Sequence, residues 1–362
     1  MKRIYLFISV FFFALTVYGT DEHVSNEESH NKSDKEEAFD PTPVIMHHIS
    51  DSHNWHLFDL TDKESGKVHP VSIPLPVILI YKGHLDVFLS SKFHHGETSV
   101  KKEDREYVLF HDKIYAIEET GLLLNEEHHP TNPKPWDFSI TKNVTSLLLS
   151  AMLLLAVFIP IARKYKKGTL VPSGLQGFLE PIVLFIKEDI AEPNIGKHNY
   201  QKFLPYLLTA FFFIWFNNML GLIPFFPGGA NLTGNIAVTM TLAFFTLVLT
   251  SKSGSKTYWG HVFTPPVPKW LWIIMIPVEI IGVLSKPFAL MIRLFANITA
   301  GHIIVLSLVS LIFIFKTVWI SPASIILVLF MDVLELLVAL LQAYIFTLLS
   351  ALFIGLAVQE HH

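Results

Sequence analysis

The chain contains no cysteine among its 362 residues, and only 16% of its side chains are charged. The missing cysteines exclude disulfides, thiolate metal sites, iron–sulfur clusters and cysteine nucleophiles. Acidic residues outnumber Lys and Arg by 31 to 27, so the chain lacks the basic surplus typical of nucleic-acid binding. It also lacks the phosphate-binding run G-x-x-x-x-G-K-[ST] and the hydrolase motifs H-E-x-x-H and G-x-S-x-G. These absences argue against a nucleic-acid-binding protein, a nucleotide-binding subunit and an intramembrane hydrolase.

Apolar residues, in contrast, are abundant. They make up 51% of the chain, with a mean hydropathy of +0.45, which is more than one soluble core requires. Residues 21–140 hold 23 of the 31 acidic side chains, whereas residues 141–362 hold 8 acidic and 14 basic ones within long apolar runs. The sequence therefore predicts a polar part followed by a membrane part.

Residues 1–20 are predicted to be a signal peptide. Lys2 and Arg3 precede the apolar stretch Ile4–Val17, and a stretch of about 14 residues is short for a membrane span of about 20. An uncleaved anchor is the alternative. Both interpretations export the chain from residue 21 onward.

Between the signal peptide and the membrane part, the sequence predicts two segments. Residues 21–52 are polar and rich in Glu and Ser, which favours disorder. Residues 53–135 show short β-type runs separated by turn residues and predict a small antiparallel β-rich module. The runs are Val71–Tyr81, Leu85–Leu89, Tyr107–His111 and Ile114–Ile117.

Eleven histidines lie between His47 and His129. Neutral imidazole is the commonest metal ligand, so a metal site is one interpretation. A solvated surface that responds to pH is the other. We favour the surface because no pair has the i, i+4 spacing of a helical metal motif, and we name no metal ligand.

Residues 136–362 are predicted to form a mainly α-helical, polytopic membrane domain. A charged amphipathic segment at about 173–192 is too short and too polar to span, and it favours a helix on the cytoplasmic membrane surface. Five apolar runs are long enough to be transmembrane helices, at about 142–163, 203–223, 235–251, 270–316 and 322–358.

The basic cluster at residues 163–167 gives the orientation of the first span. The positive-inside rule places such a cluster in the cytoplasm, so this span runs from outside to inside. That direction agrees with an exported N-terminal part, and five spans then leave the C-terminus in the cytoplasm.

The last two helices are predicted to be unusually long. As a single helix, residues 323–358 would reach roughly 54 Å against a hydrocarbon core of about 30 Å. We therefore expect this pair to be steeply inclined against a large partner. Two ordinary spans with overhanging ends are the alternative.

Ionisable residues occur within these two helices. A charge at membrane depth costs from about 3 to more than 10 kcal/mol, so such residues indicate a functional site. Arg293 is the only arginine after Arg163, and its permanent charge prevents it from carrying a proton itself. The residues of interest are Glu279, Lys286, Arg293, His302, Asp332 and Glu335, with the neutral polar residues Asn297 and Gln342.

Helical geometry groups these residues. Glu279 and Arg293 lie within about 40° of the same helix face, and Asn297 follows Arg293 by one turn. His302 and Glu335 both titrate and together suit a proton relay. Interhelical hydrogen bonds that only fasten the helices are the alternative interpretation.

Several motifs of the membrane domain are distinctive. They are Ser285-Lys286-Pro287, Ile292-Arg293-Leu294-Phe295-Ala296-Asn297, Ala300-Gly301-His302 and Leu341-Gln342-Ala343-Tyr344-Ile345-Phe346. Further pieces are Ile190-Ala191-Glu192-Pro193-Asn194-Ile195-Gly196, Asn218 with Pro224, and Asn235-Ile236-Ala237-Val238-Thr239. Together these motifs resemble subunit a of the bacterial F-type ATP synthase, over roughly residues 140–358.

The resemblance implies a proton-conducting stator subunit with two offset half-channels, in which ion flow drives rotation and ATP synthesis elsewhere in the complex. It implies no catalytic site and no cofactor in this chain. The implied partners are the c-ring subunits, the b subunit, the lipid bilayer and, indirectly, the soluble ATPase head. The implied location is the bacterial inner membrane, with the N-terminal module outside. An ion-coupled secondary transporter is the alternative, but the sequence has no paired Gly/Pro-broken segments in matching halves.

The resemblance also assigns roles to residues. Arg293 would face the carboxylate of each passing c subunit, with Asn297 and Gln342 as its polar neighbours. His302 and Glu335 would act in the outer half-channel, where many members have the carboxylate and the imidazole exchanged. The remaining expected site residues are Glu279 in the cytoplasmic half-channel and the supporting polar positions Asn218, Ser285 and Asp332.

Overall fold

The computed structural model describes most of the chain beyond residue 40. The described ranges are 41–61, 68–96, 98–117, 121–125, 129–166, 173–223, 226–315 and 320–358. The predicted signal peptide and most of the predicted disordered segment lie outside these ranges, as do Lys167, Pro224 and His128. The chain divides into two compact units. We call Pro43–Leu149 with Ile223–Ala230 the module, and Ser150–Leu222 with Asn231–His362 the membrane unit.

The module is built from short antiparallel strands, as the sequence predicts for this region. The first pair is β1 (Asn54–Thr61) with β2 (Val68–Pro74). The second sheet has the order β4-β3-β8, from β3 (Pro76–Tyr81), β4 (His84–Leu89) and β8 (Trp136–Asp137). The third has the order β5-β6-β7, from β5 (Val100–Lys102), β6 (Arg105–Phe110) and β7 (Lys113–Ile117).

Tight turns connect the strands of these hairpins. Lys82 and Gly83 have positive φ angles of 50° and 82° between β3 and β4, and His111 and Asp112 have 46° and 60° between β6 and β7. Two consecutive residues with positive φ match the right-handed twist of the flanking strands. Both turns therefore fall at the junctions between β-type runs predicted from the sequence.

The core of the module lies between the second and third sheets. Side chains on one face of β3 and β4 meet those of β5, β6, β7 and the 3₁₀ helix Ser90–Gly96. The buried residues are Val77, Leu79, Phe88, Phe93, Val100, Tyr107, Ile114 and Ala116.

One polar contact is enclosed beside this core. Arg105 Nε donates to Asp86 Oδ2 at 3.0 Å, and the Tyr107 hydroxyl donates to the same oxygen at 2.7 Å. Both charged side chains have little contact with water. Each therefore depends on the opposite charge of the other to compensate for its lost hydration.

The prediction of disorder for residues 21–52 is wrong at its C-terminal end. Thr42–Ile49 form helix α2, and Ile45 is buried. Residues 21–52 are polar on average, but the helix itself carries the apolar run Val44-Ile45-Met46. It is also held by a contact distant in sequence, because the His48 carbonyl accepts from Lys142 Nζ at 3.0 Å. The composition of the segment alone cannot reveal a contact with a residue as distant as Lys142.

The membrane unit is helical, and the mainly α-helical, polytopic prediction is confirmed. Within the described residues, five helices are long and apolar enough to cross a membrane. They are α3 (Lys142–Lys166), α6 (Tyr200–Leu222), α7 (Ile236–Ser253), α9 (Trp272–Phe315) and α10 (Ser321–Val358).

Shorter helices complete this unit. The predicted surface helix runs from α4 (Leu175–Phe185) through a π-helical segment, Ile186–Ala191, into α5 (Glu192–Ile195). The sequence reading missed α8 (Lys256–Phe263), which follows α7 after two residues.

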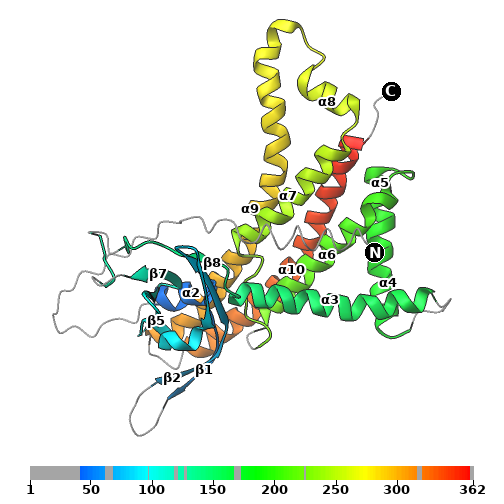
Figure 1. The fold of residues 1–362 in the computed structure, drawn as a ribbon. Coiled ribbons are helices and arrows are strands. Elements are labelled where there is room, and N and C mark those ends of the chain that lie inside the picture. Colours follow the sequence, from blue (N-terminus) through cyan, green and yellow to red (C-terminus); the bar gives the residue numbers. More distant parts are fainter. Residues whose placement is uncertain are drawn as a thin grey trace. The chain divides into compact units, whose positions relative to one another are not determined.

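Helix α10 is the central packing element of the membrane unit (Figure 1). It contacts α6, α7, α9 and α5, and small side chains line its buried face. A Cβ added to Gly355 would lie 2.8 Å from the Asn194 carbonyl carbon, so α10 and α5 approach closely only because this residue is glycine. Small residues at such contacts are typical of membrane helix packing.

Candidate functional site

The two longest helices, α9 and α10, form an antiparallel hairpin. Three contacts fix its register: Ser324 donates to the Leu308 carbonyl, Glu335 lies against Gly301, and Lys286 Nζ lies 5.7 Å from the Phe353 ring centroid. Interpolation between the last two contacts places Gln342 of α10 level with the turn of α9 that contains Arg293 and Asn297. The structure therefore brings these three predicted residues to one level of the hairpin.

Arg293 and Asn297 lie on the exposed side of α9. Between residues 280 and 304, the exposed positions of this helix are otherwise apolar except for Ser285, and Arg293 is their only charge. The large exposed side chains of this stretch are Ile280, Ile281, Leu284, Phe288, Ile292, Ile303 and Ile304. Within the described chain, the arginine thus projects from an apolar face.

Gln342 has the opposite environment. It is 4% exposed and lies on the buried side of α10, in the same row as Ala339, Ala343 and Phe346. At the level of Arg293, the hairpin therefore has a fixed charge outside and an amide inside.

Glu335 of α10 lies beside the turn of α9 that contains His302. The carboxyl group of Glu335 lies against Gly301, the residue before His302. Both side chains are partly buried. Their direct pairing remains a prediction, and so does any relay between them.

Asn218 joins three segments of the membrane unit. Its Nδ2 donates to the Ala339 carbonyl of α10 at 3.3 Å, and its Oδ1 accepts from the Thr233 hydroxyl at 2.6 Å. The side chain is 3% exposed, so it links α6, α10 and the segment before α7. This geometry explains the value of an amide here, because both of its polar atoms are satisfied.

The other two supporting positions are less enclosed. The exposed Ser285 donates to the Gly282 carbonyl of its own helix at 3.1 Å. Asp332 is exposed on α10 one turn before Glu335. Neither contacts Arg293 in any interaction described for this chain.

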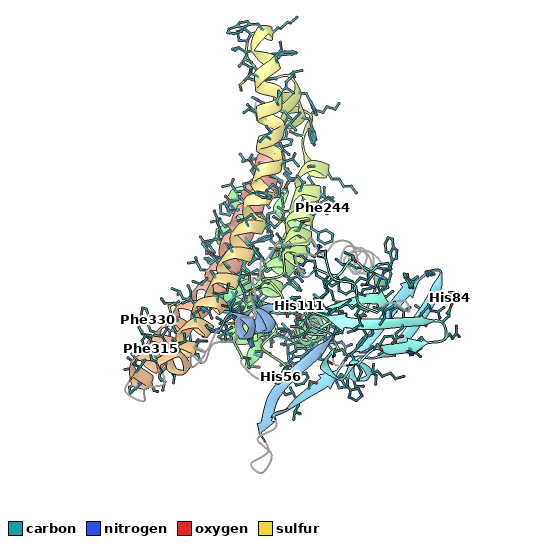
Figure 2. All side chains as sticks on the ribbon, turned by 90° about the vertical axis from the view of Figure 1, so that its left-hand side faces the viewer. His56, His84, His111, Phe244, Phe315 and Phe330 are labelled. Carbon is teal, nitrogen blue, oxygen red and sulfur yellow. The ribbon has the colours of Figure 1, made fainter. Side chains whose placement is uncertain are left out.

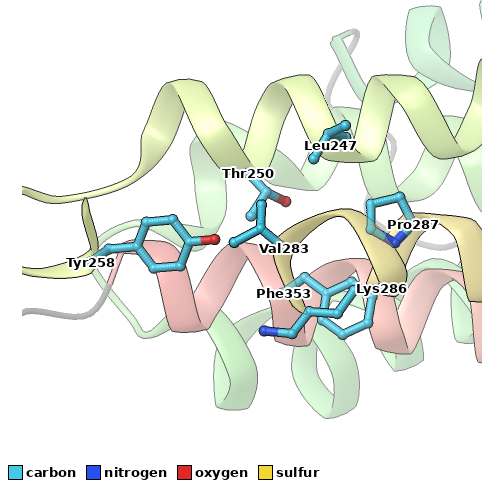
Figure 3. Close-up of a pocket in the computed structure, with 7 residues that line it drawn as sticks. All are labelled: Leu247, Thr250, Tyr258, Val283, Lys286, Pro287 and Phe353. Atoms are coloured by element: carbon cyan, nitrogen blue, oxygen red, sulfur yellow. The ribbon is translucent and has the colours of Figure 1, made fainter. Parts of the chain in front are cut away.

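A small pocket opens among α7, α8, α9 and α10, beside the first part of α9 and the last part of α10 (Figure 3). The Lys286 ammonium, the Tyr258 hydroxyl and Thr250 contribute its polar groups. Thr250 Oγ1 is buried without a hydrogen-bond partner among the described residues. The remaining lining residues are Leu247, Val283, Pro287 and Phe353.

Glu279 belongs to the same region. Glu279 is partly buried one turn before Val283. The pKa of Tyr258 is raised above 10, mainly by the burial of its hydroxyl and secondly by the charge of Glu279. The sequence reading named Glu279 but missed Tyr258 and Thr250. No local motif marks these two residues, because they join the pocket only through the packing of α7 and α8 on α9 and α10.

The histidines of the module do not form a metal centre among the described residues. Figure 2 shows His84 well separated from His56 and His111. Within the described ranges, no group of three or more His, Asp or Glu residues is arranged to hold a metal ion. His53 has a different role, since its Nε2 contacts Asp137 Oδ2 at 2.9 Å.

The fold and the site define a class: a polytopic helical membrane protein with charged residues on its two longest helices. Comparison with known proteins gives the family. A family model described as ATP synthase A chain matches residues 144–355. The chain is 49% identical to ATP synthase subunit a of Chloroherpeton thalassium over 235 residues, covering 63% of this chain and 69% of the relative. It is also 49% identical to ATP synthase subunit a 2 of Chlorobium luteolum over 299 residues, covering 78% and 85%.

The chain therefore belongs to the ATP synthase subunit a family. Its family and its helices place it in ATP synthesis and proton transport as a multi-pass membrane protein. A second family model, described as a domain of unknown function, DUF8433, matches residues 44–138. This match coincides closely with the module.

Proposed function

We propose that this chain is the proton-conducting stator subunit of an F-type ATP synthase, with Arg293 facing the carboxylates of a c-ring. The single observation that carries this proposal is the position of Arg293, exposed on an otherwise apolar stretch of α9. An arginine facing lipid is costly. A rotor subunit with an apolar surface and one carboxylate would cover the same face and compensate the charge.

The entry half-channel is assigned to Glu335 and His302. The carboxyl group reaches the Gly301 turn of α9, and an imidazole and a carboxylate both exchange protons in an accessible range. A proton delivered along this route neutralises a rotor carboxylate before it leaves Arg293 and moves into lipid. Asn218 holds α6 and α10 together behind this route.

The exit half-channel is assigned to Glu279 and the pocket beside it. The pocket gathers Lys286, Tyr258 and Thr250 at a level of α9 before Arg293. Polar groups and an unpartnered buried hydroxyl suit a hydrated path. The two half-channels are then offset along the hairpin, with Arg293 between them.

Arg293 separates the two paths by electrostatics. Its fixed charge stabilises the ionised rotor carboxylate and repels a proton moving straight across. Each charge that crosses yields about 2.3 kcal/mol per 100 mV. Rotation carries this energy to a soluble head in which ATP is made, so this chain needs no catalytic site or cofactor.

The same proposal sets partners and topology. The chain assembles with c-ring and b subunits in the bacterial inner membrane, with the module external and the C-terminus cytoplasmic. The basic residues at the end of α3, Arg163, Lys164 and Lys166, support this orientation. A signal peptide at residues 1–20 belongs to the same arrangement.

The test is Arg293→Lys in the assembled complex, with ATP-driven proton pumping in inverted vesicles as the readout. A desolvated lysine loses its proton more readily and lacks the planar fork of arginine, so we expect pumping to fall to background. Arg163→Lys at the exposed end of α3 is the matched control and should keep full pumping. Substantial pumping by assembled Arg293→Lys would overturn the proposal.

A further inference from the structure

The sheet β4-β3-β8 of the module is apolar on both of its faces. One face forms the core described above. On the other face, Ile80 is paired with Leu85 on one side and with Trp136 on the other. In the next row, Ile78 is opposite Val87, and Phe138 donates its backbone N–H to the Ile78 carbonyl at 2.9 Å. The exposed large side chains of this second face are Ile80, Leu85, Val87, Leu89, Trp136 and Phe138.

This face is not covered by any described part of the module. Trp136 is 72% exposed, Leu85 63% and Val87 53%. An antiparallel sheet with one face in water normally alternates apolar and polar residues, and here the alternation is absent. A contiguous exposed apolar patch of more than a few hundred Å² marks an interaction surface.

The connection to α3 indicates what covers it. Strand β8 ends at Asp137, and Ile140 still pairs with the sheet through its N–H to the Pro76 carbonyl at 2.9 Å. Helix α3 begins two residues later, has a mean hydropathy of 2.5, and is only 17% buried along its apolar window. The apolar sheet face is thus continuous in sequence with an exposed, apolar helix surface.

The start of α3 is also tied to the module. The Lys142 N–H donates to the Ser52 carbonyl at 3.0 Å, and the Asn143 N–H donates to Asp51 Oδ1 at 3.0 Å. These hydrogen bonds therefore hold the sheet close to the start of α3, where the chain enters the bilayer. No flexible linker separates the two.

The chemistry of the face suits a lipid surface. Trp136 and Phe138 come just before a membrane span, and aromatic side chains are enriched at the boundary between headgroups and acyl chains. A protein partner that covered the same area would not explain why the apolar face lies next to the start of a membrane span.

We propose that the second face of β4-β3-β8 rests on the lipid bilayer, on the leaflet at which α3 begins. Trp136 and Phe138 then lie at headgroup level, and the module is a monotopic attachment as well as an external domain. This inference does not depend on proton conduction, and its test is separate from that of Arg293.

The absence of cysteine in this chain makes the test direct. Val87→Cys is labelled with a nitroxide in the assembled complex, in nanodiscs of phosphatidylethanolamine and phosphatidylglycerol. Lys101→Cys is the matched control, because Lys101 is an exposed residue of β5 in the other sheet, with 76% of its side chain accessible. The unmodified complex gives the labelling background.

Collisions with oxygen and with a soluble nickel chelate report the surroundings of each nitroxide. We expect the label at position 87 to meet oxygen readily and the nickel chelate rarely, and the label at position 101 to do the reverse. Equal nickel accessibility at both positions would place the face in water and overturn the proposal. Protection of position 87 from both reagents would also overturn it, since a protein would then cover the face.

Discussion

The carboxyl group of Glu335 in α10 lies directly against the Cα of Gly301 in α9. A Cβ placed on Gly301 would overlap a carboxylate oxygen of Glu335 and lie 2.9 Å from the carboxyl carbon. Glycine at this one position therefore lets a carboxylate cross the helix interface and reach the turn of His302. The residue type that sets the geometry is not the one that carries the chemistry.

The first prediction concerns this contact. Gly301→Ala should displace Glu335 or separate the two helices, because overpacking a close contact costs about 1–3 kcal/mol. We expect ATP-driven proton pumping to fall severalfold while the complex still assembles. Gly282→Ala in the same helix is the control, since its Cβ would meet open space in this chain, and it should pump normally. Equal pumping by the two variants would show that the close contact between Gly301 and Glu335 is not required for proton pumping.

The second prediction concerns the proposed pair His302 and Glu335. The exchange His302→Glu with Glu335→His should restore more pumping than either single change retains, because a carboxylate and an imidazole again occupy the same interface. Groups in contact couple by about 0.5–3 kcal/mol. The measurement is proton pumping in a double-mutant cycle. Additive losses would mean that the two side chains act independently.

The third prediction concerns the enclosed ion pair of the module. Arg105→Leu leaves the Asp86 carboxylate without its cation, and removing one partner of such a pair destabilises the fold. Arg105 also helps to hold the pKa of Asp86 below its usual value, against the opposing effect of burial. We expect faster amide hydrogen exchange across β3 to β6 in the intact chain. Lys101→Ala, which removes an exposed pair with Glu106, should leave exchange unchanged.

The long apolar runs made the helical part of the fold predictable. Each transmembrane helix carries its own signal in composition and length, so α3, α6, α7, α9 and α10 lie close to the predicted ranges. The hairpin turns of the module were equally local.

Features that depend on distant contacts were not predictable. The run Val71–Tyr81 reads as one strand, but the chain passes from β2 to β3 at Leu75, where the Ser90 hydroxyl accepts from the Leu75 N–H at 2.9 Å. Thr250 and Tyr258 become part of a site only through helix packing. The sequence identified the polar and ionisable residues of the two long helices, whereas the exposure of Arg293 and the burial of Gln342 required the structure.

The fourth prediction is a pH dependence within the module. Burial alone lowers the pKa of His53, but the hydrogen bond and charge of Asp137 outweigh it, and Asp51 and Asp112 add to the rise above 6.5. Burial alone raises the pKa of Asp137. The hydrogen bond and charge of His53 outweigh this effect, so the pKa of Asp137 falls below 3.8. The stabilisation linked to His53 is therefore complete below pH 6.5 and is lost as the pH rises through its folded pKa.

Hydrogen exchange of the intact chain at pH 5.5 and pH 8.5 measures this effect, after correction for the intrinsic exchange rate. We expect the amides around β8 and the start of α3 to be more strongly protected at pH 5.5. His53→Gln keeps a hydrogen-bonding group without the charge and should abolish the difference. The same difference in the variant would assign it to another group.

The last prediction is that the module is dispensable for proton movement but not for the stability of α3. The ionisable residues assigned to the two half-channels all lie on α8, α9 and α10, outside the module. The start of α3, however, depends on Asp51, which accepts from the Asn143 N–H and the Thr141 hydroxyl, each at 3.0 Å. Joining residue 20 directly to Trp136 removes both contacts. The truncated chain should insert with the same topology and conduct protons passively through stripped membranes, with a lower yield of assembled complex.

Asp51→Ala in the full chain separates the two effects. It removes the acceptors at the helix start while the rest of the module remains, and loss of such a group typically costs about 0.5–2 kcal/mol. We expect a reduced yield of assembled complex and unchanged passive proton flux per complex. A truncated complex that is correctly inserted and assembled but conducts nothing would place the module in the entry path. Its exposed histidines, beginning with His84 and His111, would then be the first residues to substitute, because imidazole is the side chain that titrates closest to neutral pH.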